Sequence, residues 1–401
     1  MAKGIETTFL ARPLGDIAEA KSPIVYGIVQ PGEHIEGGVP FVQSRDVGSK
    51  INLGDLQNTS QKIAAGYKRS SIKTGDILFS LRGDIGASSI APVELDGANI
   101  ARGIARIRVR GGYDRDYVRY ALQAPEMQRV IARNANGSTF RELSIEEIRK
   151  LLLPVPPLPE QRKIAEILRT WDDAIEKLTA LRTAKLRLYS TLADGLIFGT
   201  LRLGNNRRDW TLRRLAEVTR EITARNHDGK LGRDKVMGVT NSRGIVPMRQ
   251  QTIGGDLTKY KILPPRAFAY NPMRINVGSI AMLKQDSDVL VSPDYVLFEC
   301  VPGGLDPDFL AHLRQSHFWD HYINAGGSGS VRMRTYYDDL AALRLKLPDY
   351  DEQLAISSAL NTANDEISLI AKEIDALTRQ KRGLMQKLLT GEWRVKVEGA
   401  P

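Results

Sequence analysis

The chain has 401 residues, of which 42% are hydrophobic and 26% are charged, and its formal net charge is +10. These values are typical of a folded globular protein and exclude a disordered one. The single cysteine, Cys300, excludes an intrachain disulfide framework and a cysteine-rich zinc site. Because no apolar run could cross a bilayer and no signal peptide is recognisable, we expect a cytoplasmic protein with no membrane partner. The excess of Lys and Arg favours a polyanionic partner such as nucleic acid.

Residues 1–157 are predicted to form a globular module. The runs "DILFSL" (76–81) and "IARIRV" (104–109) are expected to be strands, because they are apolar and bounded by glycine and proline clusters. One short amphipathic helix is expected over 115–133. A small, polar and basic loop, "NANGSTFRE" (134–142), follows it.

Residues 158–203 are predicted to form a long helix and its end. The opening "PVPPLPEQRKIAEIL" places Pro159 at the first helical position, where a missing N–H is harmless, with Glu160 next to the positive helix terminus. Apolar residues then recur at alternating spacings of four and three, which is a heptad seam interrupted by Arg182 and Lys185. Gly199 marks the end of the helix. Its length is about 38 residues, or roughly 57 Å.

The same organisation recurs in the second half of the chain. Glu160 aligns with Glu352 at an offset of 192, and 13 of the 44 pairs from 160–203 against 352–395 are identical. At this offset Arg82 falls on Arg274. A repeat of this length is a duplicated module rather than a solenoid unit.

The second module, residues 204–348, is expected to contain strands at "SIAML" (279–283) and "DYVLFEC" (294–300). One amphipathic helix over 307–325 and the loop "GGSGSVRMRT" (326–335) follow. Residues 349–397 contain the second long helix, whose heptad seam is broken only at Lys381 and which ends at Gly391.

The fold class is therefore predicted to be α+β. Two tandem α/β modules are each followed by a long helix, and the two helices pair as an antiparallel coiled coil, since neither can bury its stripe alone. The alternative is that each helix packs on its own module. The residues expected to form the coiled coil or to contact partners are Glu160, Gln161, Ile164, Leu168, Trp171, Ile175, Glu352, Gln353, Ile356, Leu360, Ile367 and Ile370.

The two polar loops are predicted to contact DNA, because Ser, Thr and Arg reach phosphates and base edges, and arginine commonly reads guanine. An ordinary surface loop is the alternative, and a structural role is the alternative for the two aligned arginines that precede a matched glycine. The candidate DNA-binding residues are Arg82, Ser138, Thr139, Arg141, Arg274, Ser328, Ser330, Arg332 and Arg334.

No catalytic or metal site is expected in this chain. "YNPMR" (270–274) lacks the second proline and the aromatic residue of an adenine methyltransferase motif, and "PDYVLFECV" lacks the lysine of a nuclease motif. His317 and His321 have the spacing of paired metal ligands, but no glutamate follows His317.

Taken together, the chain resembles the specificity subunit of a type I restriction–modification system. The resemblance is carried by "PLPEQRKIAEIL" and its partner "DEQLAISSAL", by the helix ends "GLIFGTLRL" and "LLTGEWRV", and by the duplicated module. The opening of the second helix, "PDYDEQ", departs from "PPLPEQ", so docking at that end is less well defined.

This resemblance implies two target recognition domains, each reading one half of a split, asymmetric double-stranded DNA target. It also implies that two modification (methyltransferase) subunits dock on the central helices and that restriction (translocase and endonuclease) subunits join them. The specificity subunit would hold no cofactor and catalyse nothing. S-adenosylmethionine, ATP and Mg would be bound by the partner subunits, which methylate adenine or cleave.

Two other functions are compatible with the sequence. The chain could serve a methyltransferase-only assembly or a fused restriction system, which neighbouring genes would decide. It could instead be a coiled-coil scaffold without DNA contact, which predicts no effect of changes at Arg141 or Arg332.

If the paired helices set the gap between half-sites, inserting one heptad into both helices is expected to change the tolerated spacer and leave the half-site sequences unchanged. Sequencing the methylated motifs of cells that carry the variant measures both quantities. Altered half-sites with an unchanged spacer would contradict the expectation.

Overall fold

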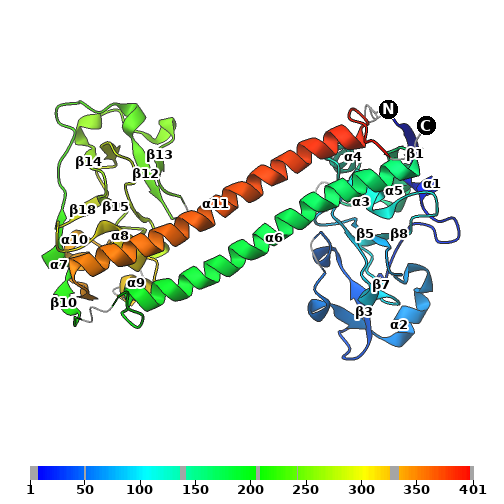
Figure 1. Ribbon diagram of the computed structural model, residues 1–401, viewed down its shortest axis with the longest axis horizontal. Helices are drawn as coiled ribbons and strands as arrows, with labels where there is room; N and C mark the ends of the chain where they lie inside the picture. The colour runs from blue at the N-terminus through cyan, green and yellow to red at the C-terminus, as the bar shows by residue number, and fades with distance from the viewer. Residues whose placement is uncertain are drawn as a thin grey trace. The chain divides into compact units, whose positions relative to one another are not determined.

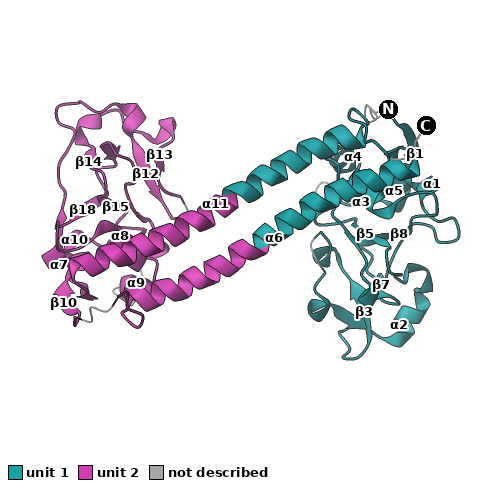
Figure 2. Cartoon of the chain, in the orientation of Figure 1, with its two compact units in different colours: residues 1–179, 372–401 teal, residues 180–371 magenta. Residues whose placement is uncertain are grey.

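The computed structural model describes residues 8–48, 51–135, 141–204, 208–241, 243–325 and 334–397. They belong to two compact units, unit 1 (1–179 and 372–401) and unit 2 (180–371) (Figure 2). Each unit combines one module with the first half of the helix that leaves that module and with the second half of the other long helix. Unit 2 is continuous in sequence, whereas unit 1 is completed by the last part of the chain.

Module 1 is a mixed structure built on small sheets (Figure 1). Its central sheet has the order β2-β8-β5-β6, with antiparallel pairing, and a three-stranded sheet has the order β4-β3-β7. The strands are β1 (Leu10–Pro13), β2 (Val25–Tyr26), β3 (Val39–Val42), β4 (Gln57–Thr59), β5 (Ile77–Ser80), β6 (Ser88–Ile90), β7 (Asn99–Ile100), β8 (Ile104–Ile107) and β9 (Leu152–Val155). The helices are α1 (Leu14–Ile17), α2 (Gln61–Gly66), α3 (Arg115–Gln123), α4 (Pro125–Asn134), α5 (Ile145–Lys150) and the long α6 (Leu158–Ile197).

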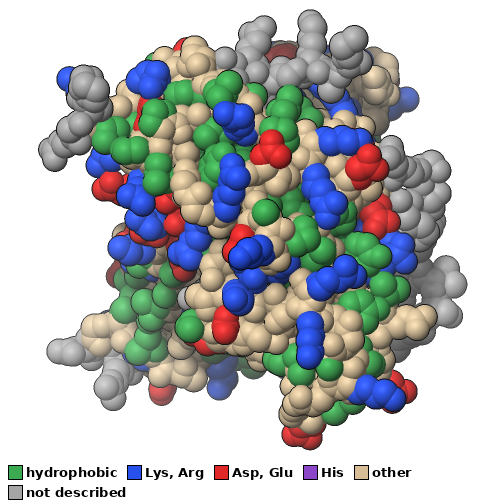
Figure 3. All heavy atoms as spheres, turned by 90° about the vertical axis from the view of Figure 1, so that its right-hand side faces the viewer, with side chains coloured by type: hydrophobic (Ala, Val, Ile, Leu, Met, Phe, Trp, Pro, Cys, Tyr) green, Lys and Arg blue, Asp and Glu red, His purple; other side chains and the backbone are tan. Residues whose placement is uncertain are grey.

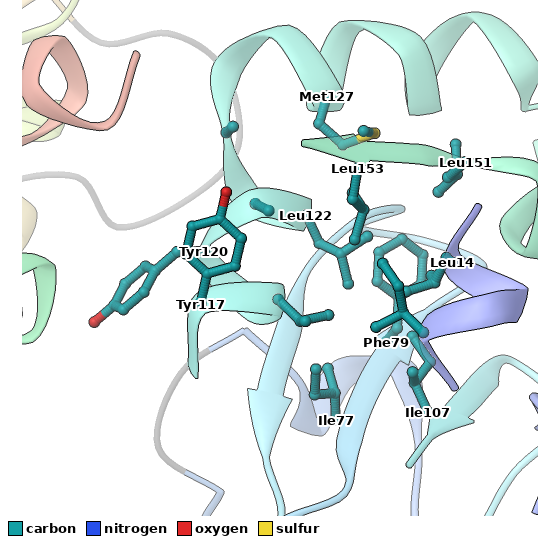
Figure 4. Close-up of a cluster of buried hydrophobic side chains, with 14 of the residues drawn as sticks. Leu14, Ile77, Phe79, Ile107, Tyr117, Tyr120, Leu122, Met127, Leu151 and Leu153 are labelled. Carbon is teal, nitrogen blue, oxygen red and sulfur yellow. The ribbon is translucent and has the colours of Figure 1, made fainter. Parts of the chain in front are cut away.

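The main core of unit 1 lies where the central sheet meets the helices. Figure 4 shows Ile77 and Phe79 of β5 close to Leu14 of α1 and Ile107 of β8, and all four side chains are fully buried. Burying a side chain of this size stabilises the fold by about 1.5–3 kcal/mol. The same cluster extends onto both long helices through Ile164, Leu168, Met385, Leu388 and Leu389. The long helices are therefore part of this core.

Module 2 repeats this plan. Its four-stranded sheet has the order β11-β18-β15-β16, so β15, β16 and β18 take the places of β5, β6 and β8. The strands are β10 (Thr211–Arg214), β11 (Thr219–Glu221), β12 (Met237–Thr240), β13 (Gly244–Pro247), β14 (Lys261–Leu263), β15 (Phe268–Tyr270), β16 (Ile280–Met282), β17 (Val289–Val291), β18 (Val296–Cys300) and β19 (Arg344–Leu347). The helices are α7 (Leu215–Val218), α8 (Pro307–Leu313), α9 (His317–Ala325), α10 (Tyr337–Ala341) and α11 (Tyr350–Leu389).

The strands predicted from the sequence are confirmed, but each predicted amphipathic helix is two helices. Residues 115–133 divide into α3 and α4 at Ala124, because Pro125 cannot continue an α-helix. Residues 307–325 divide into α8 and α9 without a proline. There Ser316 breaks the helix, because its hydroxyl donates to the Leu313 carbonyl and accepts the Trp319 amide.

The heptad seams predicted for the two long helices coincide with their protected faces. Of the predicted seam residues, Trp171 and Ile175 are half-buried and the others are buried, namely Ile164, Leu168, Ile356, Leu360, Ile367 and Ile370. Within each unit the two helices run antiparallel. In unit 1 Glu160 and Asp172 pair with Arg394 and Lys381, and in unit 2 Lys185 and Arg202 pair with Glu366 (2.8 Å) and Glu352. Two of the three polar residues that interrupt the seams, Lys185 and Lys381, thus form ion pairs between the helices.

The alternative packing is also partly realised. Ile164 and Leu168 join the core of module 1, and Ile356 and Leu360 join the core of module 2. Each long helix therefore begins on its own module and then pairs with the other helix.

The Glu-Gln pair that opens each long helix ties it to its module. In unit 1 the Gln161 Oε1 accepts the Asp114 amide (2.9 Å), and its Nε2 donates to the Pro156 carbonyl (2.8 Å). Asp114 is the N-cap of α3 and accepts the Tyr117 amide (2.9 Å). The glutamine is buried, so it fixes the start of α6 against the start of α3.

Unit 2 contains the same contacts at the aligned positions. Gln353 Oε1 accepts the Asp306 amide (2.9 Å), and its Nε2 donates to the carbonyls of Pro348 (3.1 Å) and Gly304 (3.2 Å). Asp306 caps α8 through the Phe309 amide (3.0 Å). Both glutamines therefore bond within their own unit.

The glutamates bind an arginine that follows the other long helix. In unit 1 the Arg394 guanidinium donates Nε and Nη2 to the two oxygens of Glu160, both at 2.7 Å, and its carbon lies 5.1 Å from the Phe9 ring centroid. This hydrogen bonding raises the pKa of Arg394. Gly391, at φ 76°, leaves room for Phe9, because a Cβ there would lie 2.9 Å from the ring.

The unit 2 copy of this junction contains an additional hydrogen bond. Arg202 donates to both oxygens of Glu352 (2.7 and 2.8 Å) and lies 5.4 Å from the Trp210 ring. Trp210 takes the place of Phe9 and adds a bond from its indole N–H to Glu352 (3.3 Å). Gly199 packs against this ring, as Gly391 packs against Phe9.

A second set of aligned positions has diverged. In unit 1 the Tyr120 hydroxyl donates to Asp172 (2.7 Å), and the Lys381 ammonium lies 5.3 Å from the Tyr120 ring. The offset of 192 aligns Tyr120 with His312 and Lys381 with Tyr189. In unit 2 the Tyr189 hydroxyl bonds His312 Nδ1 (2.8 Å), and His312 Nε2 bonds Asn361 Oδ1 (2.9 Å). A charged contact between module and helices is thus replaced by a neutral one.

Replacing Gln353 with Leu is expected to destabilise the protein by about 2–3 kcal/mol, because the buried Asp306 amide and Pro348 carbonyl would have no partner. Urea unfolding of the full chain measures this change, and hydrogen exchange at the Asp306 amide locates it. The control is Gln380→Leu, at an exposed position of the same helix. Equal stability of the two variants would contradict the assigned role.

The His312 contacts predict acid sensitivity in unit 2. Burial lowers the pKa of His312 and outweighs the hydrogen bond to Asn361, which raises it. Because an unfolded histidine titrates near 6.5, the stabilisation is full above that pH and is lost as the pH falls through the lower folded value. Unfolding measured between pH 7 and 5 should be less pH-dependent for His312→Gln than for the parent or for His317→Gln, which changes an exposed histidine. An unchanged pH dependence in His312→Gln would refute this.

Candidate nucleic-acid interface

Three backbone segments of module 1 lie side by side at the end of strand β5. The Leu81 amide donates to the Gly103 carbonyl (2.8 Å), and the Leu81 carbonyl accepts the Leu143 amide (3.1 Å). Gly86, at φ 95°, turns the chain back toward β6, and a Cβ there would lie 2.4 Å from the Gln128 side chain. These contacts bring together three segments that each carry an arginine. We call this group the module 1 arginine edge, and its members are Arg82, Arg102 and Arg141.

The three arginines differ in their contacts. Arg82 Nη2 donates to Glu142 Oε2 (2.6 Å), and this bond raises the pKa of Arg82. Arg141 donates to the Ala132 carbonyl, near the end of α4. Arg102 is exposed and forms no ion pair within the described residues. The edge therefore offers one guanidinium held by a carboxylate and two that are open to an anion.

Module 2 forms a corresponding edge. The Thr335 amide donates to the Pro272 carbonyl (3.0 Å), and the Arg274 carbonyl accepts the Ser279 amide (3.0 Å). The turn between β12 and β13 packs against the turn at Gly278. The contact is so close that a Cβ added to Gly278 would lie 2.6 Å from the Asn241 side chain. The module 2 arginine edge consists of Arg243, Arg274 and Arg334.

All three arginines of this second edge are exposed. Hydrogen bonding to Tyr336 raises the pKa of Arg334. Neither Arg243 nor Arg274 forms an ion pair within the described part of the chain. Three unneutralised cations in one place suit a polyanion.

The predicted site residues are only partly described. Arg82, Arg141, Arg274 and Arg334 lie on the two arginine edges. Ser138, Thr139, Ser328, Ser330 and Arg332 lie outside the described residues, so their roles stay predictions.

Two members of the arginine edges, Arg102 and Arg243, were not predicted from the sequence. A weak signal existed for Arg102, since "ARG" at 101–103 repeats "LRG" at 81–83 and both lie beside buried strands. The comparison of the two halves at an offset of 192 did not select Arg102, because Asp294 occupies the aligned position. Arg243 had no sequence signal, because its place depends on the packing of the β12–β13 turn.

Positive charge is not confined to these edges. Figure 3 shows Lys and Arg side chains spread over the face turned to the viewer, with acidic side chains between them. Such a surface supports affinity for nucleic acid without sequence preference.

A different surface hollow lies between α3 and α6 in unit 1. The cavity has a volume of about 890 Å³. Its charged lining is mainly acidic, and consists of Glu94, Asp116, Arg119, Arg169, Asp172, Asp173 and Glu176. This hollow suits a basic protein segment better than DNA, because carboxylates repel phosphates.

Two further features bear on the kind of protein. No group of three or more His, Cys, Asp or Glu side chains among the described residues is arranged to hold a metal ion. Within the same residues, none of the helices combines the length and the apolar character required to span a membrane.

Comparison with known proteins connects this architecture to one family. The sequence profile described as "Type I restriction modification DNA specificity domain" matches residues 11–186. The specificity subunit of the Escherichia coli type I restriction enzyme EcoBI is 30% identical over 169 residues, which are 41% of this chain and 35% of that protein. The chain thus matches about a third of that relative's length.

Other similarities extend over the whole chain. A putative type I restriction enzyme MjaX specificity subunit from Methanocaldococcus jannaschii is 25% identical over 96% of this chain and 93% of its own length. The crystal structure of a type I restriction–modification S subunit from M. genitalium has the same fold, with a TM-score of 0.60 at 13% identity, and the alignment covers 97% of this chain and 98% of that one. The duplicated modules, the paired helices and these matches agree: residues 11–186 match the type I restriction–modification DNA specificity domain, and the whole chain is similar to specificity subunits of such systems.

Proposed function

We propose that the chain is the DNA-reading subunit of a type I restriction–modification complex, with each module reading one half of a split target. The observation that carries this proposal is the recurrence of an arginine edge at the end of the aligned strands β5 and β15. Two similar readers in one chain suit a bipartite target. Because the modules differ in sequence, the two halves of the target would also differ.

Recognition would combine two kinds of contact. Lys and Arg side chains neutralise phosphates and give affinity that falls with salt and ignores sequence. Other side chains of the edges and the adjoining loops contact base edges, and a well-made bidentate contact discriminates by about 1–3 kcal/mol. The chain supplies recognition and no chemistry.

Two modification subunits are the proposed protein partners, and restriction subunits would join the same complex. Support comes from the duplicated junction, because the same Glu-Gln tie and Glu–Arg pair give both units the same geometry at the start of a long helix. Two equivalent surfaces suit two copies of one partner. S-adenosylmethionine, ATP and Mg would be bound by those partners, which would methylate adenine or cleave DNA.

Replacing Arg274 or Arg334 with Ala is expected to weaken binding of target and non-target duplexes alike. The slope of log K against log salt should fall by about 1 for each phosphate that the variant no longer neutralises. Fluorescence anisotropy of the reconstituted complex between 50 and 200 mM salt, about the range over which such contacts matter, measures both effects. Arg129→Ala is the control, since Arg129 pairs with Glu126 on α4, outside both edges. Affinities equal to the parent at every salt concentration would argue against DNA contact at the module 2 edge.

A further inference from the structure

The module 1 arginine edge contains a carboxylate where a phosphate-binding surface would exclude one. Glu142 Oε2 lies 2.6 Å from Arg82 Nη2, and the Arg82 and Glu142 side chains are 42% and 37% exposed. An antiparallel backbone bridge between residues 82 and 142 places Glu142 directly opposite Arg82. A partly exposed carboxylate on this edge repels DNA phosphates, so its presence there requires a specific reason.

The aligned position in module 2 has the opposite charge. With Arg82 on Arg274, the offset of 192 places Glu142 on Arg334. Arg274 forms no ion pair within the described residues, and Arg334 is brought next to its turn by the bond from the Thr335 amide to the Pro272 carbonyl (3.0 Å). One edge thus pairs its aligned arginine with a carboxylate, and the other places a second cation beside it.

We propose that Glu142 determines specificity in module 1, by holding the Arg82 guanidinium in one orientation so that it reads a guanine. The aligned Arg274 and Arg334 would instead bind phosphates in module 2. This inference rests on the proposed DNA-reading function. It assigns different tasks to two arginines that the duplication makes equivalent.

The geometry favours base reading by Arg82. A guanidinium has five N–H donors, and the bond to Glu142 uses one at Nη2, which leaves donors for the O6 and N7 of a guanine. Holding a long side chain in advance reduces the ordering cost of binding. The neighbouring carboxylate also weakens any competing contact to phosphate, because it neutralises the cation. An arginine that is already paired with a carboxylate therefore gains more from contact with a neutral base edge than from contact with the DNA phosphates.

The test uses the full chain in complex with its modification subunits. Glu142→Gln removes the negative charge and keeps the shape, and Glu142→Ala removes the contact as well. The matched control is Glu146→Gln, because Glu146 forms a 2.6 Å ion pair with Lys150 on α5 of the same module. Selection from a randomised duplex pool, together with sequencing of methylated motifs, gives the preference at every position of both half-sites.

Glu142→Gln and Glu142→Ala are expected to relax one G·C position of the module 1 half-site by about tenfold. They should leave the other half-site unchanged and increase binding to non-target DNA with a salt slope steeper by about 1, as Arg82 becomes free to bind phosphate. Glu146→Gln should keep the parental motif. An unaltered motif in both Glu142 variants would overturn the inference and make the pair an ordinary surface ion pair.

A reciprocal change tests the difference between the modules. Arg334→Glu places a carboxylate beside Arg274 and should weaken non-target binding more than Arg334→Gln, which only removes a cation. Equal affinities of the two variants would contradict the assignment of Arg274 to phosphates. Thermal unfolding of each variant separates a defect in recognition from a defect in folding. If the parent complex itself bound no DNA, the proposed function would fail, whereas a specific parent with insensitive variants would refute only this inference.

Discussion

Two buried glutamines hold this architecture together. Gln161 and Gln353 each join the first turn of a long helix to the N-cap of a module helix, and no other described side chain makes that connection in both units. The adjoining glutamates bind an arginine from the opposite helix end, so module, departing helix and arriving helix meet at one place. Because the two glutamines are buried and hydrogen-bonded, removing either one leaves a backbone amide and a backbone carbonyl without a partner.

The duplication explains what is common to the two units, and its divergence explains what is not. The ties at Glu160 and Glu352 are nearly identical. The next layer has changed from Tyr120 with Lys381 and Asp172 to His312 with Tyr189 and Asn361. The arginine edges have changed further, to the point of charge reversal at Glu142 and Arg334. Divergence thus increases from the helix junction toward the surface that we assign to DNA.

The long helices could be predicted from sequence because their signal is local and repeated. Heptad spacing identified the seam residues, and the glycines at 199 and 391 identified the ends, where both take positive φ. The role of Gln161 could not be predicted, because its partner Asp114 is remote in sequence. The helix break near Ser316 was missed because serine is a weak signal without its hydrogen bonds. Arg82 was found by the repeat, but its pairing with Glu142 depends on a strand contact that no local pattern contains.

The composition of unit 1 affects how the chain can fold during synthesis. The apolar surface of module 1 around Ile164 and Leu168 is completed by Met385, Leu388 and Leu389, which are translated only after all of unit 2. Unit 2 is a single continuous stretch, 180–371, so all of its residues are translated together. Module 1 therefore leaves the ribosome with an uncovered apolar surface. This surface stays exposed to solvent until unit 2 has been translated. During that interval it is the part of the nascent protein most exposed to aggregation and most in need of a chaperone.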